Sequence, residues 1–481
     1  MTLRLSLVVS LLAAGPAFAQ PAPKQQPAPK QPAPRPAAGK PAAPPVVDDM
    51  AEFDKDLDAL FAQGGLTASQ AASRAGAASP TVRRRVAEIE AAVAQTEAAG
   101  LARVPQVSGK LSYNRLSHID PVSLTIGTTT LNIVSLENAY LAEAQLVIPL
   151  SDYVLRYPKL IETARLGAEV ARLNKQSSEI GAGQDARIAY YEWVRANLQV
   201  LISKRQLLQV QKTLDQVRAL TEVQRLSRAD LLRVESQEAE AEQVVDQLTT
   251  LAQLREEQLR LLIGATSSEP LAIGEDIRGE AAGAVPGSLD DLVGTAKRQR
   301  VEFKAIDVGI EAKESQRKAE QANLLPRLAA VGVVDYADPN QRVFPQQDAF
   351  KLTWAIGAQL TWTLNDALIS RTSDRRIAAE ANELRADRES LERGTRIEVL
   401  SAQQQVTIAQ HALTTTQKGL TAAQEAYRVR KELLNADRAT AVELVDAETE
   451  LTRSRIAALN ARVDLRVARA QLEHALGNDT K

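Results

Sequence analysis

The chain has 481 residues, and its 58 basic and 60 acidic residues leave a formal net charge of −2. Because there is no basic excess to neutralise phosphates, the composition argues against a nucleic-acid-binding protein. The chain has no cysteine, which excludes disulfides, thiolate metal sites and cysteine nucleophiles. Aromatic residues make up only 4%, and the abundance of Ala, Leu, Gln, Glu and Arg favours long helices over a large mixed core.

The first 47 residues predict an exported protein with a tether. Residues 1–19 have the form of a signal peptide, with Arg4 before a short apolar run and a small-x-small cleavage signature at Ala17–Ala19. The alternative, an N-terminal anchor helix, would need a longer apolar run. Residues 20–47 are near repeats of Pro, Ala, Lys and Gln, which predict a disordered tether. That tether is either a plain spacer or a contact for an anionic partner.

Residues 48–266 form a first predicted repeat. Its N-terminal part is helical from about 66 to 102, with Thr67 as a helix cap and a restart at Ser79-Pro80. Period-2 alternation predicts strands at about 104–117 and 138–150, separated by a loop at about 118–135. A nearly uninterrupted helical pattern then predicts a long helical hairpin over about 152–263, ending at Gly264.

Residues 267–288 carry Gly, Pro and acids and predict a linker, and residues 289–478 then repeat the first pattern. Strands are expected at about 325–337 and 350–364, and a second helical hairpin at about 366–476. Matching residues recur at a nearly constant offset, as in Val82 and Phe303, Pro105 and Pro326, and Gly264 and Gly477. We expect about four extra residues near Lys431–Arg438 in the second repeat.

The stretch Phe350–Asp366 shows strand alternation most clearly, because its even positions are apolar and its odd positions are polar or small. Such a strand has one apolar and one wet face. It fits either the edge of a soluble sheet or a tilted membrane-spanning strand. In the membrane case, the residues expected to face lipid are Leu352, Trp354, Ile356, Leu360 and Trp362.

Four strands per chain cannot close a barrel, and lipid does not tolerate an open sheet edge. If the strands lie in a membrane, other copies must complete the sheet: two copies give eight strands and three give twelve. Long Ala-rich helices also need neighbours packed along them, in coiled-coil fashion. Both elements therefore predict an oligomer.

In this order of elements the chain resembles the TolC-type outer-membrane efflux (outer-membrane factor) family. The resemblance covers about residues 66–477. It rests on the duplicated plan, Leu-Pro-Arg-Leu at 325–328, Leu-Thr-Trp-Thr-Leu-Asn-Asp at 360–366, and the closing pattern from Tyr427 through Thr440–Leu451 to Gly477. It implies a mainly α fold with a small transmembrane β-barrel. Three copies would form a 12-stranded β-barrel continued by a periplasmic α-helical barrel, and no cofactor is implied.

The same resemblance implies a passive exit duct of a tripartite efflux or type I secretion system. The location would be the outer membrane of a Gram-negative cell, with the helices extending into the periplasm. The partners would be outer-membrane lipid, a periplasmic adaptor and an inner-membrane pump of the RND, ABC or MFS type. The cargo stays open among drugs, metal ions and secreted proteins.

The resemblance also implies a gate at the periplasmic tips, where acidic residues ring the lumen. The matching positions are Glu443 and Asp446, whose alternative role is that of ordinary solvated helix residues. The hairpin tips would contact the adaptor through Arg225, Leu226, Ser227, Asp437, Arg438 and Ala439. Unlike the usual family pattern, neither tip contains glycine.

An enzyme is not expected. The three histidines, His118, His411 and His474, lie far apart without metal-ligand spacing, and no phosphate-binding glycine loop is present. We expect His411 and His474 to be surface residues. The rival interpretation is a periplasmic adaptor or a secreted coiled-coil scaffold, although an adaptor would carry one helical hairpin between β-rich domains.

Overall fold

The computed structural model describes residues 49–120, 122–133, 136–279, 287–436 and 438–479. It divides into a unit from Met1 to Asp49 and a unit from Met50 to Lys481, and the elements below belong to the second unit except for the first residue of α1. The predicted signal peptide and tether lie outside the described residues. So do residues 280–286 of the predicted linker and the tip residue Asp437.

The N-terminal helices begin and end where their caps predict. Thr67 caps α2 in a reciprocal arrangement with Gln70, as predicted, and Ser79 separates α2 from α3, which begins at Pro80. Proline suits this first position because a helix leaves its first N–H groups unbonded anyway. The elements are α1 (Asp49–Leu60), β1 (Phe61–Leu66), α2 (Ala68–Ala78) and α3 (Pro80–Leu101).

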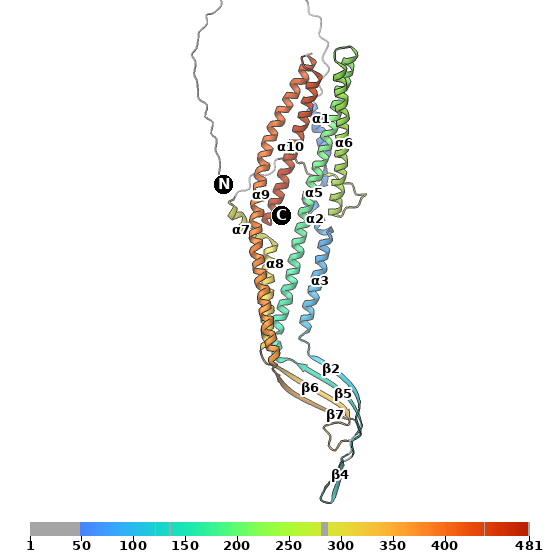
Figure 1. Ribbon diagram of the computed structural model, residues 1–481, viewed down its shortest axis with the longest axis vertical. Coiled ribbons are helices and arrows are strands. Elements are labelled where there is room, and N and C mark those ends of the chain that lie inside the picture. Colours follow the sequence, from blue (N-terminus) through green and yellow to red (C-terminus); the bar gives the residue numbers. More distant parts are fainter. Residues whose placement is uncertain (1–48, 121, 134–135, 280–286, 437, 480–481) are drawn as a thin grey trace, which may run out of the picture. The chain divides into compact units, whose positions relative to one another are not determined.

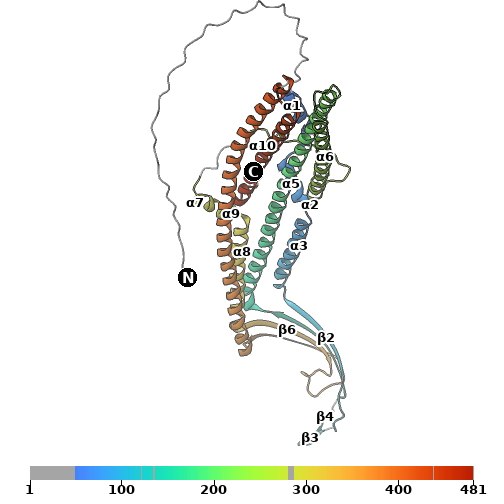
Figure 2. The ribbon, with the colours of Figure 1, turned by 45° about the horizontal axis from the view of Figure 1, so that its top comes forward.

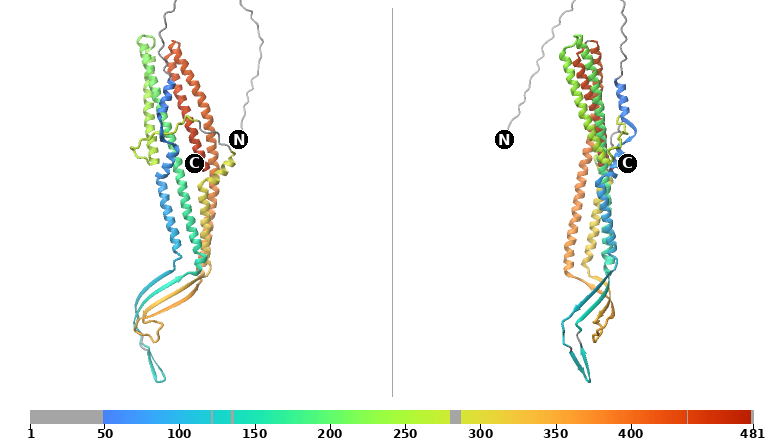
Figure 3. Two further views of the ribbon diagram at one scale, coloured as in Figure 1. Left: turned by 180° about the vertical axis from the view of Figure 1, so that it is seen from behind. Right: turned by 90° about the vertical axis from the view of Figure 1, so that its right-hand side faces the viewer.

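One antiparallel sheet joins the two repeats. Its strand order is β2-β5-β6-β7, so the repeats meet at the β5–β6 pair. The strands are β2 (Gln106–Arg115), β5 (Asn138–Ile148), β6 (Arg327–Asp338) and β7 (Lys351–Thr361). In both views of Figure 3 these four strands curve together. Trp362 lies one residue beyond β7, because helix α9 already begins at Leu364.

The segment predicted as a loop at 118–135 instead contains a two-stranded hairpin, so that prediction was wrong. Strands β3 (Val122–Ile126) and β4 (Thr129–Ile133) pair antiparallel across a turn at Gly127, whose φ is +67°. Thr, Ile and Val favour strands, and glycine adopts this left-handed backbone without strain. The sequence pattern of Thr, Ser, Gly and Asn hid these short strands.

Two long helical hairpins follow the strand pairs. After the short helix α4 (Leu150–Leu155), the first is α5 (Tyr157–Glu222) with α6 (Arg228–Ile263), and the second is α9 (Leu364–Asn435) with α10 (Ala441–Leu476). At 1.5 Å per residue, α5 and α9 are each roughly 100 Å long. Figure 1 shows the hairpin turns at the opposite end of these helices from the sheet.

The second repeat reproduces the first in its buried and capping residues. Helix α3 packs along α5, and α8 (Val301–Gln321) packs along α9 (Figure 2). Val82 and Phe303 are both buried, and Gly264 and Gly477 both end a helix with positive φ. Helix α7 (Leu289–Gln299) is the counterpart of α2, because its cap Ser288 follows Thr67 at the same spacing as Phe303 follows Val82. A short 3-10 turn at Ala322–Leu324 follows α8.

The expected insertion near Lys431–Arg438 is absent. Helix α6 is capped by Ser227 and ends at Gly264, and helix α10 is capped by Thr440 and ends at Gly477. The two caps are separated along the chain by the same number of residues as the two glycines. The two hairpins therefore match residue for residue from the cap to the terminal glycine. Before the caps, 75 residues lead from Asp152 to Ser227 and 74 from Asp366 to Thr440, which leaves no room for an insertion. The long helical run offered no landmark by which to align them, whereas the caps do.

The part of the linker that the structure describes is a fixed belt, defined here as residues 265–279. Ile273 and Ile277 are buried in the main hydrophobic cluster, together with Tyr190 and Trp193 of α5. Ile273 also forms parallel bridges to Phe61 and Leu66. The belt thus packs against the N-terminal elements and the long helices, and so joins α1, β1 and α2 to them.

Candidate functional site

The strand register gathers the apolar side chains on one face of the sheet. Neighbouring strands place Leu111 opposite Ala142, Ala142 opposite Tyr336, and Tyr336 opposite Leu352. The large apolar residues of this face are strongly exposed, with Leu111 at 86% and Ile356 at 81%. The predicted lipid-facing residues Leu352, Trp354, Ile356 and Leu360 all lie on it, and the exposed Trp362 follows directly. A contiguous apolar surface of this extent marks an interaction surface.

The opposite face of the sheet carries one fully polar row, and its other rows mix polar residues with small or apolar ones such as Val331 and Val333. The polar row across the four strands reads Lys110, Glu143, Asp335 and Thr353. Because side chains alternate along a strand, every row on this face lies on the other side from Leu111 and Ile356. The sheet therefore separates an apolar environment from a wet one.

Aromatic side chains mark both ends of the apolar face. At the end away from the helices, the ring centroids of Tyr113 and Tyr140 lie 4.9 Å apart, and those of Tyr336 and Phe350 lie 5.0 Å apart. At the helical end Trp362 is 59% exposed. Trp362 lies ten positions after Leu352, which is roughly 33 Å of extended chain. Once tilted, that length matches an apolar band about 25 Å tall between aromatic girdles.

The sheet has two open edges. In the described residues, β2 and β7 each pair with one strand only. Each therefore presents unpaired backbone N–H and C=O groups along its outer side. Since β2 and β7 run antiparallel to each other in the strand order, the β7 edge of one chain can pair with the β2 edge of another.

The two hairpin tips share one backbone arrangement. The N–H of Arg225 donates to the carbonyl of Leu220, and the N–H of Arg438 donates to that of Leu433, both at 2.8 Å. Both arginines are exposed at the ends of their hairpins. Without glycine, the first tip places Gln224 in the left-handed region, with φ of 58°. Glutamine thus takes the conformation that glycine adopts more easily.

The other tip residues are partly structural. Leu226 packs against the cluster of Leu214, Val217, Val234 and Val445. Ser227 caps α6 through a reciprocal arrangement with Asp230. Ala439 is partly buried beside the cap Thr440, and Asp437 lies outside the described residues.

Each of the two acidic residues predicted to form the gate has its own arginine partner. Glu443 is bonded by Arg430 of α9, with Nη1 2.7 Å from Oε2. Asp446 lies 3.6 Å from Arg233 of α6. All four side chains are about half exposed. The two predicted gate acids are therefore each paired with an arginine of the same chain. The sequence analysis did not predict these pairs, although Arg233 occupies the position equivalent to Asp446 in the first repeat.

A buried carboxylate ties the two hairpins together below the tip. Glu448 of α10 is 4% exposed and accepts hydrogen bonds from Gln209 at 3.3 Å and Thr213 at 3.1 Å, both on α5. Further along the same seam, Arg195 of α5 donates to Asp464 of α10 at 2.5 Å. This seam joins the first repeat to the second, and no local sequence signal singled out Glu448.

Comparisons with known proteins bear on this arrangement. Residues 292–478 match the family model described as outer membrane efflux protein. This second repeat is an outer membrane efflux protein domain. No curated protein matches the sequence. The match spans strands β6 and β7 and the second helical hairpin.

Solved structures show that the whole described fold is that of the TolC-type channels. A crystal structure of CusC has a TM-score of 0.71 at 16% identity, covering 87% of this chain and 93% of that one. The open MtrE channel of Neisseria gonorrhoeae has a TM-score of 0.69 at 17% identity, covering 85% and 88%. VceC of Vibrio cholerae has a TM-score of 0.66 at 16% identity, covering 85% and 96%.

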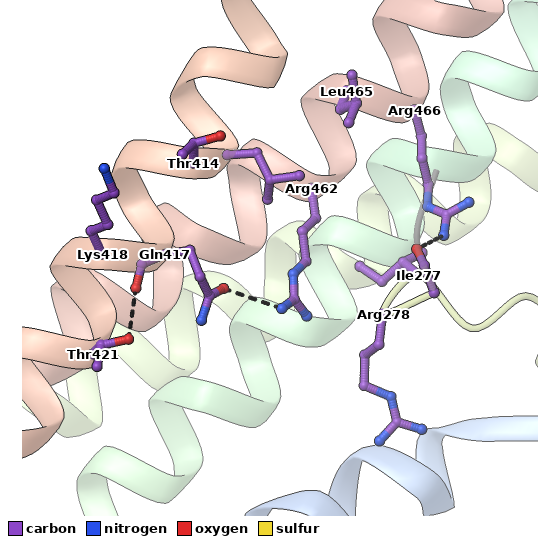
Figure 4. A pocket seen from close by; sticks show the side chains of 11 residues that line it. Ile277, Arg278, Thr414, Gln417, Lys418, Thr421, Arg462, Leu465 and Arg466 are labelled. Atoms are coloured by element: carbon purple, nitrogen blue, oxygen red, sulfur yellow. Dashed lines mark hydrogen bonds between the residues drawn. The ribbon is translucent and has the colours of Figure 1, made fainter. Parts of the chain in front are cut away.

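A cavity of about 480 Å³ lies between the belt and the helices α9 and α10 of this efflux protein domain. Arg466 donates to Glu275 at 2.9 Å and to the backbone carbonyl of Gly279 at 3.1 Å. Figure 4 shows Arg462 reaching toward Gln417, at 3.3 Å. The guanidinium group of Arg466, which lines this cavity, thus links the belt to the second hairpin through hydrogen bonds.

The histidines divide between surface and interior. His411 is exposed as expected, but His474 is only 25% exposed, and its Nδ1 lies 2.8 Å from Asp479. The hydrogen bond with Asp479 raises the pKa of His474. In the described part of the chain, no group of three or more His, Asp or Glu is placed to hold a metal ion. Nor does any described helix combine the length and apolarity needed to cross a membrane.

Proposed function

We propose that three copies of this chain form a passive channel across the outer membrane and periplasm. The observation that carries the proposal is the apolar, girdled sheet face bounded by two unpaired edges. Lipid requires both edges to be paired, and pairing β7 of one chain with β2 of the next gives twelve strands from three chains. The polar row from Lys110 to Thr353 would then line the lumen.

Exposed apolar residues on the helices support the same assembly. Leu254 and Leu261 lie seven residues apart on α6, and are 53% and 75% exposed. On α9, Ile397 and Ile408 are 69% and 61% exposed. Such positions need neighbouring helices. Packing α9 of one chain against α6 of the next would bury both sets and continue the barrel as a helical tube.

The channel would work in a tripartite efflux or type I secretion system, beside a periplasmic adaptor and an inner-membrane pump of the RND, ABC or MFS type. The surfaces for the adaptor would be the tips, where Arg225 and Arg438 occupy equivalent exposed positions. Three chains would present six arginines there. An acidic or carbonyl-rich adaptor tip suits that surface. The gate would lie beside it, at Glu443 and Asp446.

Fractionation followed by bilayer recording tests the proposal. We expect the full chain in the outer-membrane fraction as a trimer that dissociates on heating, and we expect the purified trimer to conduct ions in a planar bilayer. Recovery as a soluble periplasmic monomer would contradict the proposal. That result would favour the rival, an adaptor or coiled-coil scaffold, although two hairpins that each follow a strand pair argue against it.

A further inference from the structure

The junction between sheet and helices carries a collar of exposed apolar residues in both repeats. On α9 and just before it these are Trp362, Leu364, Leu368 and Ile369, which are 54% to 63% exposed. On α4 they are Leu150, Val154 and Leu155, which are 41% to 76% exposed. These three residues match Leu364, Leu368 and Ile369 in turn, at one constant spacing along the chain. The equivalent positions are therefore apolar and exposed in both repeats.

A neighbouring subunit cannot cover both halves of the collar. Helix α9 follows β7, an edge strand, whereas α4 follows β5, an inner strand. A second copy that pairs with the β7 edge would reach the first helix but not the second. If the sheet lies in the membrane as proposed, the surroundings that both helices share, next to the apolar sheet face, would be lipid.

Arginines follow the collar on the same face of α9. Leu364, Leu368, Arg371 and Arg375 are spaced by four, three and four residues, which places them along one helical stripe. The stripe thus changes from apolar to cationic as it leaves the sheet. Arg371 and Arg375 are exposed, and in the described residues neither makes an ion pair or side-chain hydrogen bond.

The height of these arginines matches the lipid headgroups. Arg371 lies seven residues, or roughly 10 Å, beyond Leu364. The headgroup region extends about 5 to 8 Å beyond the hydrocarbon core on each side. Long side chains on a helix lean toward its N-terminus, here toward the membrane, and arginine extends its charged end to the interface. With the sheet in the membrane, the guanidinium group of Arg371 would lie within a Debye length of about 8 Å from the headgroups, and Arg375 would lie one helical turn further out.

More unpaired cations surround the same junction. Arg103, just after α3, and Arg165, in the third turn of α5, are exposed and form no ion pair in the part of the chain described. Among the described residues, the side chain of Arg327, at the start of β6, donates to the neutral side chain of Asn323 and forms no ion pair. Ordinary exposed arginines in this chain usually pair with a nearby acid, as Arg393 does with Glu389. The junction instead leaves these arginines without an acidic partner in the described residues, and its one exposed acid on the first turn of α9, Asp366, is also unpaired there.

We infer that this collar binds anionic phospholipid of the periplasmic leaflet, with the apolar residues against acyl chains and Arg371 and Arg375 against phosphate groups. The inference rests on the proposed insertion of the sheet in the membrane. Basic residues near an anionic surface each strengthen its binding about fivefold. The collar would fix how deeply the barrel sits.

Lipid selectivity of the full-length protein in nanodiscs tests the inference. Spin-labelled phosphatidylglycerol and phosphatidylcholine serve as probes, and the measured quantity is the ratio of their association constants at the protein surface. We expect the wild type to favour phosphatidylglycerol several-fold at low salt. In the double variant Arg371→Gln/Arg375→Gln, the ratio of the two association constants should fall close to one.

Arg83→Gln is the matched control, because Arg83 is exposed and unpaired in the described residues but lies in the first turn of α3, at the far end of that helix from the sheet. It should leave the preference unchanged. Equal preference in the wild type and the double variant would overturn the inference. A weaker trimer without loss of preference would also overturn it and would assign the arginines to a subunit contact.

Conductance of the same samples separates the two proposals. A conducting trimer without lipid preference would remove the lipid site and leave the channel intact. A protein that fails to insert would contradict both.

Discussion

Arg233 and Asp446 lie 3.6 Å apart and occupy equivalent positions in the two repeats, with the same separation along the chain as Gly264 and Gly477. One repeat position therefore carries opposite charges in its two copies, and the two copies meet at the tip. Glu443 is similarly engaged by Arg430. The proposed gate is thus a set of internal ion pairs rather than a ring of unpaired acids.

Charge removal at the gate should move divalent-cation block in opposite directions. Replacing Glu443 and Asp446 with Ala should weaken block of single-channel current, because it removes the carboxylates. The double variant Arg233→Gln/Arg430→Gln should strengthen block, because it frees them. Exposed pairs contribute at most about 1 kcal/mol each, so we expect changes of about fivefold or less in the blocking concentration.

Exchanging the charges supplies the control for that experiment. Arg233→Asp alone places two acids together and should raise the open probability. Adding Asp446→Arg should return it toward the wild-type value. Independent effects of the two substitutions would show that the pair does not hold the gate.

The strained residue at the first tip predicts a stabilising substitution. Gln224→Gly should stabilise the turn by up to about 1 kcal/mol, because glycine adopts a positive φ without steric cost. Gln224→Val should destabilise it, since β-branched residues resist this conformation. Hydrogen exchange at residues 220–228 measures both effects, and slower exchange in the Val variant would contradict the assigned backbone.

The buried Glu448 should hold the first hairpin to the second. Thr213→Val removes one of its donors and should cost about 1 to 3 kcal/mol, lowering the temperature at which the trimer dissociates. Thr250→Val is the control, because the Thr250 hydroxyl bonds only within its own helix. If both variants melt alike, the link between α5 and α10 contributes nothing measurable.

The pair of His474 and Asp479 predicts a pH dependence. The pKa of His474 is raised above its ordinary 6.5 by the hydrogen bond with Asp479, so folding favours the protonated form. The stabilisation is fully present below pH 6.5 and is lost as the pH rises through the raised pKa. His474→Gln should therefore lower the melting temperature at pH 5.5 by more than at pH 8.5, by an amount equivalent to about 1.5 kcal/mol.

His411→Gln serves as the control for the pH experiment, because His411 is exposed on α9. It should leave the melting temperature unchanged at both pH values. An equal loss at pH 5.5 and 8.5 in the His474 variant would show that its charge does not matter.

Structural features that depend on residues close together in the chain could be predicted from the sequence. The alternation along β7 and the cap at Thr67 depend only on local backbone chemistry. So do the terminal glycines Gly264 and Gly477, which end their helices with positive φ. The duplicated plan then followed from comparing these landmarks.

Features that depend on contacts between residues far apart in the chain could not be predicted from the sequence. Arg233, Arg430 and Glu448 look like ordinary solvated helix residues until the hairpins pack side by side. The belt carries Gly, Pro and acids like a linker, yet Ile273 and Ile277 are buried because α5 and β1 cover them. Asp437 and the predicted tether lie outside the described residues, so those interpretations stay predictions.

Disulfide cross-linking between chains tests whether β7 of one chain pairs with β2 of the next, and the absence of native cysteine makes the result specific. Cysteines placed on the polar face of β2, at Ser108, Lys110 or Ser112, are combined with cysteines on β7, at Thr353, Ala355 or Gly357. The pair Ser108→Cys/Gln145→Cys, opposite each other in β2 and β5, should cross-link within one chain. We predict that at least one β2–β7 combination gives covalent trimers in outer membranes. Monomers from every combination, with the control pair fully cross-linked, would contradict the account.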